Sequence, residues 1–240
     1  MLKSETMIGL ISSVPFEAGL ILESLGRGKG KAIPPLAEGA VGGKRAAYIC
    51  SGIGIANAAR AVAILAERKK PDAVIFFGIG GAYASGGLRK GDLAAAREEV
   101  YAEGGLIVTG GTARTKDGFR ALGFPLLKKG RRNFFSSFPL DKGLLQEAKK
   151  CIPDLRTGRF LTVYAAGRSI KQADLLGLGH DAILENMEGA AAAHTALFYG
   201  IPLLEIRGVS NIAGEPPRKW RKEEAALNCQ KAVLKLLAAL

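Results

Sequence analysis

Residues 71–82 of this sequence read PDAVIFFGIGGA, and they indicate the kind of fold that the chain adopts. Ala73–Phe77 is a short apolar run rich in β-branched and aromatic residues, which is typical of a strand buried on both faces. Four residues, Gly78-Ile79-Gly80-Gly81, follow at once, and glycine lets a backbone make a tight turn or approach a ligand closely. The stretch therefore predicts a buried strand that ends in a glycine loop.

Similar apolar runs recur along the chain, and helix-length amphipathic segments separate them. The other predicted strands are Met7–Ser13, Ala46–Ser51, Leu161–Tyr164, Ala182–Leu184 and Pro202–Val209. One predicted helix begins at Pro15, and the others cover Ile55–Lys69, Glu188–Tyr199 and about Arg221–Ala239. This alternation predicts an α/β domain whose sheet is covered by helices on both faces. Because no change of composition marks a linker, we expect residues 1–240 to form one domain.

The composition is that of a globular protein, because 48% of the 240 residues are hydrophobic and 23% are charged. Two histidines and three cysteines (Cys50, Cys151 and Cys229) lack the spacing of a metal site or a disulfide framework. We therefore expect no metal and a reduced, cytoplasmic protein. The uncharged stretches Ala73–Leu88 and Gly189–Leu204 are shorter than the roughly 20 residues of a membrane-spanning helix, and no signal peptide is expected.

The net charge is +12, from 34 Lys and Arg against 22 Asp and Glu. Residues 112–132 hold seven of the basic residues and a single acid, and a second basic group (Arg218, Lys219, Arg221 and Lys222) surrounds Trp220. Such runs form a solvated surface, a nucleic-acid patch or a site for an anionic small molecule. Nucleic-acid sites often place aromatic residues among the basic ones, but Phe119 and Phe124 are the only aromatic residues of 112–132, and no nucleic-acid motif is present. We therefore expect no nucleic-acid partner and keep that function as the remote alternative.

The glycine loops do not match the fingerprint of a dinucleotide site. Asn57 stands where the third glycine after Gly52-Ile53-Gly54 belongs, and Tyr83 stands in the corresponding place after Gly78-Ile79-Gly80. The first strand is followed by Ser12-Ser13-Val14-Pro15 and not by glycines. A dehydrogenase is therefore disfavoured, and no cofactor is expected.

Polar residues near the ends of the predicted strands are the candidates for chemistry. Glu185 and Glu188 close one strand, where a carboxylate can accept hydrogen bonds from sugar hydroxyls or favour the start of a helix. Arg207 and Asn211 lie four residues apart on the last strand, and Glu17 begins the first helix. Since ligands of α/β folds gather at the carboxyl ends of strands, we expect these side chains to converge.

Five segments together resemble the nucleoside phosphorylase/nucleosidase superfamily. They are SGIG (51–54), PDAVIFFGIGGA (71–82), KGD (90–92), ENMEGAA (185–191) and IPLLEIRGVSN (201–211), and their order and separation match over nearly the whole chain. The resemblance implies a single-domain three-layer sandwich in which helices flank a mixed central sheet. It also implies a purine nucleoside substrate and a homo-oligomer.

Within that superfamily the chain is most similar to the branch that hydrolyses futalosine in menaquinone biosynthesis. The features that carry this similarity are Asn211, where methylthioadenosine/S-adenosylhomocysteine nucleosidases have Asp, and the sequence Pro-Arg-Lys-Trp at 217–220. The expected reaction is hydrolysis of the N-glycosidic bond of futalosine, which releases hypoxanthine and dehypoxanthine futalosine.

The resemblance also assigns roles to individual residues. Glu17 matches the general base for the attacking water, and Arg207 helps to position that water. Met187 and Glu188 hold the ribose. The remaining substrate-binding positions are Asn186, Ile53, Gly78, Ile79 and Gly80. Two of these depart from the pattern, since Ile79 replaces a Ser or Thr and Asn186 replaces a Glu that many nucleosidases carry.

Asn211 bears on which base is released. A 6-oxopurine presents the acceptor O6, and its N7 gains a proton as the base leaves; an Asn amide can donate to the first and accept from the second. Against adenine the same amide leaves a polar group unpaired, at a cost of about 1–3 kcal/mol. The sequence therefore predicts hypoxanthine as the preferred base.

Alternatives and details remain open at this point. One alternative is another purine nucleosidase, acting on methylthioadenosine, S-adenosylhomocysteine or aminodeoxyfutalosine. The other is a purine nucleoside phosphorylase that uses phosphate, for which Arg is a natural ligand. A base such as Glu17 favours water over phosphate, because only water must lose a proton. Futalosine carries an aromatic carboxylate at its 5′ end, so basic residues of 112–132 or 218–222 are expected to attract it, and Tyr164 is a candidate to stack on the purine.

Overall fold

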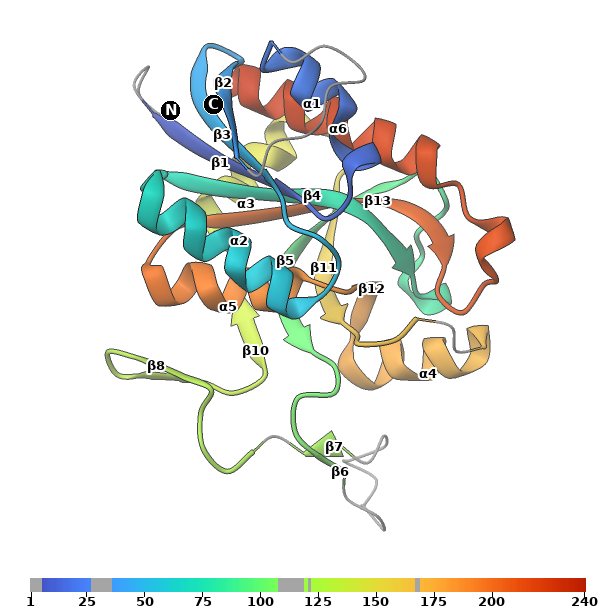
Figure 1. The fold of residues 1–240 in the computed structure, drawn as a ribbon. Coiled ribbons are helices and arrows are strands. Elements are labelled where there is room, and N and C mark those ends of the chain that lie inside the picture. Colours follow the sequence, from blue (N-terminus) through green and yellow to red (C-terminus); the bar gives the residue numbers. More distant parts are fainter. Residues whose placement is uncertain (1–5, 27–35, 108–118, 121, 167–168) are drawn as a thin grey trace.

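A nine-stranded mixed sheet forms the centre of the molecule (Figure 1). The computed structural model describes residues 6–26, 36–107, 119–120, 122–166 and 169–240. The strands of the sheet are β1 (Met7–Ser12), β2 (Ala37–Val41), β3 (Lys44–Cys50), β4 (Ala73–Ala82), β5 (Leu93–Tyr101), β10 (Ser137–Pro139), β11 (Arg156–Thr162), β12 (Ala182–Asn186) and β13 (Leu203–Ile212). Two small ribbons pair β6 (Leu106–Ile107) with β7 (Phe119–Arg120) and β8 (Leu127–Lys129) with β9 (Arg132–Phe134).

The sheet closes on itself at one end. Its strand order is β10-β5-β11-β12-β4-β1-β3-β2, and β13 lies between β4, to which it is parallel, and β5, to which it is antiparallel. Strands β4, β13, β5, β11 and β12 consequently form a ring, whereas β1, β3 and β2 extend from it as an open sheet. The ring brings β5 and β13 together although about 100 residues separate them in the sequence.

Helices cover both faces of the sheet. Helices α1 (Gly19–Ser24), α3 (Lys142–Cys151) and α6 (Lys222–Ala239) pack on one face, where their apolar residues share a core with the inner strands. Helices α2 (Ile55–Arg68) and α5 (Gly189–Tyr199) pack on the other face around a second core, and α4 (Ile170–His180) lies beside β12. The predicted three-layer α/β sandwich with a mixed sheet is confirmed.

Local signals set most of these elements within a few residues of their predicted bounds. Helix α2 ends just before Pro71, and α5 ends at Gly200, whose φ of 74° is the left-handed conformation that glycine adopts most easily. Strand β4 is longer than predicted, because Gly78–Gly81 continue the ladder beside β13. The sequence did not predict strands β2 and β5–β10 or helices α3 and α4. The short turns η1 (Pro15–Ala18), η2 (Ala84–Gly86) and η3 (Pro217–Lys219) complete the chain.

None of the helices within the described ranges is long and apolar enough to span a membrane.

Candidate active site

A cleft of about 860 Å³, counted out to its open mouth, lies beside the glycine half of β4. Its inner wall carries most of the polar residues singled out in the sequence: Glu17, Glu185, Asn186, Glu188, Arg207 and Asn211. Met187, Ile53, Ile79 and Gly80 also line it. Strands β1, β4 and β13 are mutually parallel and end at this rim, whereas β12 runs antiparallel to β4 and delivers Glu188 from the opposite direction.

Glu17 is buried at the inner end of the cleft, and three backbone N–H groups hold its carboxylate. Ser13 N and Val14 N donate to Oε2 at 3.0 and 3.1 Å, and Ile79 N donates to Oε1 at 2.8 Å. Burial raises the pKa of Glu17 above its ordinary value, and the nearby charge of Glu188 adds to this, whereas Arg207 and the backbone donors act in the opposite direction. A carboxylate with a raised pKa is a stronger base and is suited to accept a proton.

Gly78 makes room for this carboxylate. A Cβ at Gly78 would stand 2.5 Å from Glu17 Oε1 and 3.0 Å from Arg207 Nη1, so any larger residue would displace one of the two. Gly78 pairs with Arg207 in the β4–β13 ladder and lies behind Glu17, and it is not among the described residues that line the cleft. The structure therefore places Gly78 as the support for Glu17 and Arg207.

Arg207 is 1% exposed and joins the carboxylates of the site. Its Nε donates to Glu205 Oε1 at 2.8 Å, its Nη2 lies 3.5 Å from Glu188 Oε2, and its Nη1 donates to Ile79 O at 3.3 Å. Its guanidinium also lies 4.6 Å from the centroid of the Phe76 ring. Burial disfavours the charge, but the carboxylates of Glu205, Glu188 and Glu17 together raise the pKa of Arg207, so it stays a cation.

Glu188 is the residue before α5, and its carboxylate reaches across the cleft to the loop before α2. Oε1 accepts a hydrogen bond from Gly54 N at 3.0 Å, where φ of +97° requires glycine. The second oxygen faces Arg207. The carboxylate is therefore held between the Gly54 loop and Arg207 of β13, with lone pairs left for sugar hydroxyls.

Asn186 has its polar atoms bonded within the protein. Its Oδ1 accepts from Glu188 N at 2.9 Å and Gly189 N at 2.7 Å, which satisfies the free N–H groups at the start of α5, and its Nδ2 donates to Glu99. Glu185 is also buried, and the hydroxyl of Tyr83 donates to it at 3.1 Å. These two residues shape the wall of the cleft on either side of the strand end.

Asn211 also lines the cleft, at a bulge where β13 shifts register against Gly81 of β4. Ser210 Oγ lies 2.7 Å from its Oδ1, and its Nδ2 donates to Ile212 O at 3.1 Å. These contacts hold the amide in one orientation. One N–H and one lone pair of the amide remain for a ligand.

The mouth of the cleft is more apolar and carries one cation. Phe16, Ile53 and Trp220 line it, and Lys222 Nζ lies 5.3 Å from the centroid of the Trp220 ring. Lys222 has no ion pair with any residue that the structure describes. Tyr164, by contrast, is 73% exposed and is not among the described lining residues; Val163 and Ala166 line that side.

Sequence reasoning missed several residues of the site. Ser13 lines the cleft, and its buried hydroxyl has no hydrogen-bond partner among the described residues. Glu99 and Glu205 support Asn186 and Arg207 from behind. A signal for Glu205 was present, since a carboxylate two residues before an arginine in an apolar strand indicates a buried ion pair. In the part of the chain that the structure describes, no group of three or more His, Cys, Asp or Glu is placed to hold a metal.

This geometry can be compared with that of known proteins. Residues 7–240 match the family model described as the phosphorylase superfamily. The chain belongs to the phosphorylase superfamily. Among the relatives of this superfamily member is the futalosine hydrolase of Thermus thermophilus, which is 38% identical over 192 residues, 80% of this chain and 80% of that protein. The predicted membership of the nucleoside phosphorylase/nucleosidase superfamily is thus confirmed.

Solved structures of the superfamily have the same fold. A methylthioadenosine/S-adenosylhomocysteine nucleosidase of Colwellia psychrerythraea in complex with adenine has a TM-score of 0.78 at 24% identity, covering 98% of this chain and 96% of that one. A futalosine hydrolase mutant of Helicobacter pylori has a TM-score of 0.77 at 20% identity, covering 98% and 100%. At these identities the likeness establishes the fold.

Proposed function

We propose that the protein hydrolyses the N-glycosidic bond of futalosine, releasing hypoxanthine and dehypoxanthine futalosine. The observation that carries the proposal is the convergence of Glu17, Glu188, Arg207 and Asn211 in one cleft. The 38% identity to a futalosine hydrolase supports it. The chemistry needs a base for water, an anchor for the ribose and a partner for the departing purine, and each has a candidate residue.

Glu17 is the base that takes a proton from the attacking water. Its carboxylate is fixed by backbone donors rather than by a flexible side chain, so it can accept a proton without moving. Arg207 lies beside it across Gly78 and can hold the water oxygen. A phosphorylase would need no such base, because phosphate is already an anion.

Glu188 and Met187 hold the ribose. The carboxylate of Glu188 is fixed between Gly54 and Arg207 and accepts hydrogen bonds from the sugar hydroxyls. A negative charge below the ring also stabilises the positive charge that develops on the sugar as the base departs. The neighbouring thioether of Met187 covers the apolar face of the ribose.

Asn211 holds the purine. With its orientation set by Ser210 and Ile212 O, its free N–H donates to O6 and its free lone pair accepts from the protonated N7 of hypoxanthine. Adenine offers a donor at its C6 position, which would face the amide N–H. The cleft therefore favours a 6-oxopurine.

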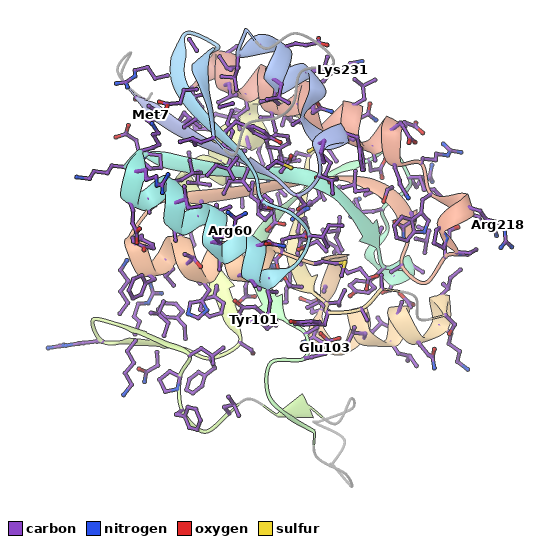
Figure 2. The ribbon with its side chains drawn as sticks, viewed as in Figure 1. Met7, Arg60, Tyr101, Glu103, Arg218 and Lys231 are labelled. Carbon is purple, nitrogen blue, oxygen red and sulfur yellow. The ribbon has the colours of Figure 1, made fainter. Side chains whose placement is uncertain are left out.

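Lys222 receives the carboxylate at the 5′ end of futalosine, and the Trp220 ring packs beside its aromatic part. Among the described residues of the two basic groups, only Lys222 lines the cleft, and Arg218 projects from the outer edge of the molecule (Figure 2). Residues 112–118 and 121 of the other group lie outside the described residues. Its described basic side chains Lys128, Lys129, Arg131 and Arg132 do not line the cleft.

The proposal extends to the pathway, the compartment and the oligomeric state. The reaction belongs to menaquinone biosynthesis in the cytoplasm, with a homo-oligomer as the working form and without nucleic acid as a partner. Light scattering on the purified protein measures the oligomeric state.

The test is chromatography of purified protein incubated with futalosine, inosine or methylthioadenosine, with and without phosphate. We expect hypoxanthine from futalosine at the highest catalytic efficiency, independently of phosphate. Strict dependence on phosphate would indicate a phosphorylase instead. Equal efficiency on methylthioadenosine would contradict the role of Asn211.

A further inference from the structure

Two more carboxyl groups lie behind Arg207, outside the cleft. Glu99 on β5 and Glu205 on β13 are both 0% exposed. Glu205 Oε1 accepts a hydrogen bond from Arg207 Nε at 2.8 Å. The other oxygen, Oε2, is buried and has no hydrogen-bond partner among the described residues. Leaving a buried carboxylate oxygen without a donor costs folding free energy, so a neighbouring group is expected to supply a hydrogen bond to Oε2.

Glu99 connects to the start of α5 on its other side. Its Oε2 accepts from Thr162 Oγ1 at 2.8 Å, and its Oε1 accepts from Asn186 Nδ2. The same two side chains bind the first N–H groups of the helix, because Thr162 Oγ1 accepts from Ala190 N at 2.7 Å and Asn186 Oδ1 accepts from Glu188 N. Glu99 is thereby linked to the turn that carries Glu188.

Gly189 marks the place where the two carboxyls meet. A Cβ on this glycine would overlap both Glu99 Oε1 and Glu205 Oε2, so the two oxygens face the same small space and the side chains are within hydrogen-bond reach. Two ionised carboxylates in contact repel each other, and neither could donate to the other. A single proton removes the repulsion and supplies the missing donor.

We propose that Glu99 is a protonated positioning residue that donates a hydrogen bond to ionised Glu205, so that the pair holds Arg207 on one side and the Glu188 turn on the other. The proton belongs on Glu99 because Glu205 has the Arg207 cation beside it, whereas Glu99 has only neutral partners besides Glu205. The effect on activity rests on the proposed function, but the protonation state does not.

The electrostatics agree with this placement. Burial raises the pKa of Glu99 well above its ordinary value, and the charge of Glu205 raises it further. Burial also raises the pKa of Glu205 above its ordinary value, but the charge of Arg207 acts in the opposite direction, so Glu99 is the carboxyl of the pair that holds the proton more firmly. The other titratable groups around the pair are Glu188, which faces Glu205, and Tyr101 at the end of β5 (Figure 2), whose own pKa is raised by burial.

The first test is infrared spectroscopy of the purified protein above about pH 6, where ordinary Asp and Glu side chains are ionised. The carbonyl stretch of a protonated carboxylic acid should be present in the wild type and lost in Glu99→Gln. It should also be lost in Glu205→Gln, because the new amide donates to Glu99 and lets it ionise. A band of undiminished intensity in Glu99→Gln would overturn the proposal, as would its absence from the wild type, and a Glu17→Gln spectrum identifies any contribution from Glu17, whose pKa is also raised.

Glu98→Gln is the matched control. Glu98 is the preceding residue of β5, and although burial acts against its charge, hydrogen bonds from Ser137 and Arg159 lower its pKa. This variant should keep the infrared band unchanged. The comparison separates loss of one particular proton from a general disturbance of β5.

The second test is kinetic. Glu99→Gln keeps a donor towards Glu205, so its kcat should stay within about threefold of the wild type, whereas Glu99→Leu should lose about tenfold or more. At alkaline pH the wild type should lose kcat as Glu99 ionises, and Glu99→Gln should not. Equal losses in the Gln and Leu variants, with the alkaline decline retained, would contradict the proposal. If the wild type does not act on futalosine, the proposed function fails, but the infrared result still decides the protonation of Glu99.

Discussion

Two sets of buried carboxyls flank Arg207, and they are satisfied in different ways. Glu17 and Glu188 face the cleft and accept hydrogen bonds from backbone N–H groups of Ser13, Val14, Ile79 and Gly54. Glu99 and Glu205 lie behind it, accept only from side chains, and lack one donor unless they share a proton. Backbone donors cannot be titrated or rotated away, so they hold the cleft-facing carboxylates in position for chemistry, while the pair behind them supports Arg207 and the start of α5.

Substitutions in the two carboxyl sets should also have different effects. A change at a cleft-facing carboxylate removes a group that touches the substrate, and it should act on kcat or KM at once. A change in the rear pair reaches the reaction only through Arg207 and α5, so it should act on stability and on the pH range of activity.

Glu17→Gln should lower kcat by about 10²- to 10⁴-fold, because the amide cannot accept the proton of the attacking water. KM for futalosine should change little, since Glu188 and Asn211 remain in place. Steady-state kinetics with hypoxanthine detection measures both, and the melting temperature shows that the variant is folded. Glu98→Gln, outside the cleft, should keep full activity; a loss smaller than about tenfold for Glu17→Gln would exclude Glu17 as the base.

The pH profile of activity should show Glu17 on its acid limb and Glu99 on its alkaline limb. Since the pKa of Glu17 is raised and its ionised form is the base, kcat/KM should rise with pH through a value above the ordinary pKa of Glu.

Stability should also depend on pH. Because their pKa values are raised by folding, Glu17 and Glu99 contribute stability at acid pH that is lost as pH rises through their folded-state pKa values. The melting temperature of the wild type should therefore fall towards alkaline pH more steeply than that of Glu99→Gln; parallel curves would show that Glu99 is ionised throughout.

Gly189→Ala should destabilise the protein by about 1–3 kcal/mol, because the new Cβ overlaps the oxygens of both Glu99 and Glu205. Thermal or urea unfolding measures the loss. Gly19→Ala is the control, since a Cβ there meets only Gln230 Oε1 at 4.0 Å and the helical backbone accepts alanine. Equal stability of the two variants would mean that the rear pair is not tightly packed.

Asn211→Asp should reduce the preference for futalosine over methylthioadenosine by about tenfold, since a carboxylate repels O6 and accepts from the 6-amino group of adenine. The ratio of kcat/KM on the two substrates is the measurement. Asn228→Asp on α6, whose amide bonds Gly91 O outside the cleft, should leave the ratio unchanged. An unchanged ratio in Asn211→Asp would remove this residue from base recognition.

Lys222→Met should raise KM for futalosine by about two- to fivefold, the effect of a partly exposed charge pair, and leave KM for inosine unaltered. Lys219→Met, an exposed neighbour outside the cleft, is the matched control. Added salt should weaken the difference. If KM rises equally for inosine, Lys222 acts on the shape of the mouth and not on the carboxylate.

Much of the site could be predicted from the sequence because each residue lies in or just after a recognisable strand. Glu17 and Glu188 follow β1 and β12, Arg207 and Asn211 lie within β13, and the structure brings all four into one cleft. Tyr164 was misplaced, because exposure depends on how the segment after β11 packs, which local pattern does not report. Strand β5 was missed because its sequence, LAAAREEVY, mixes alanine with charges and lacks a long apolar run.

The sequence by itself determined the α/β alternation, the helix ends at Pro71 and Gly200, and the set of polar residues at the rim, because these depend on neighbours within a few positions. Only the tertiary structure decided that β13 lies between β4 and β5. That placement brings Glu205 against Glu99, which also accepts a hydrogen bond from Asn186. The physical reason is distance along the chain, since about 100 residues separate the two carboxyls and only the closed ring of strands brings them together.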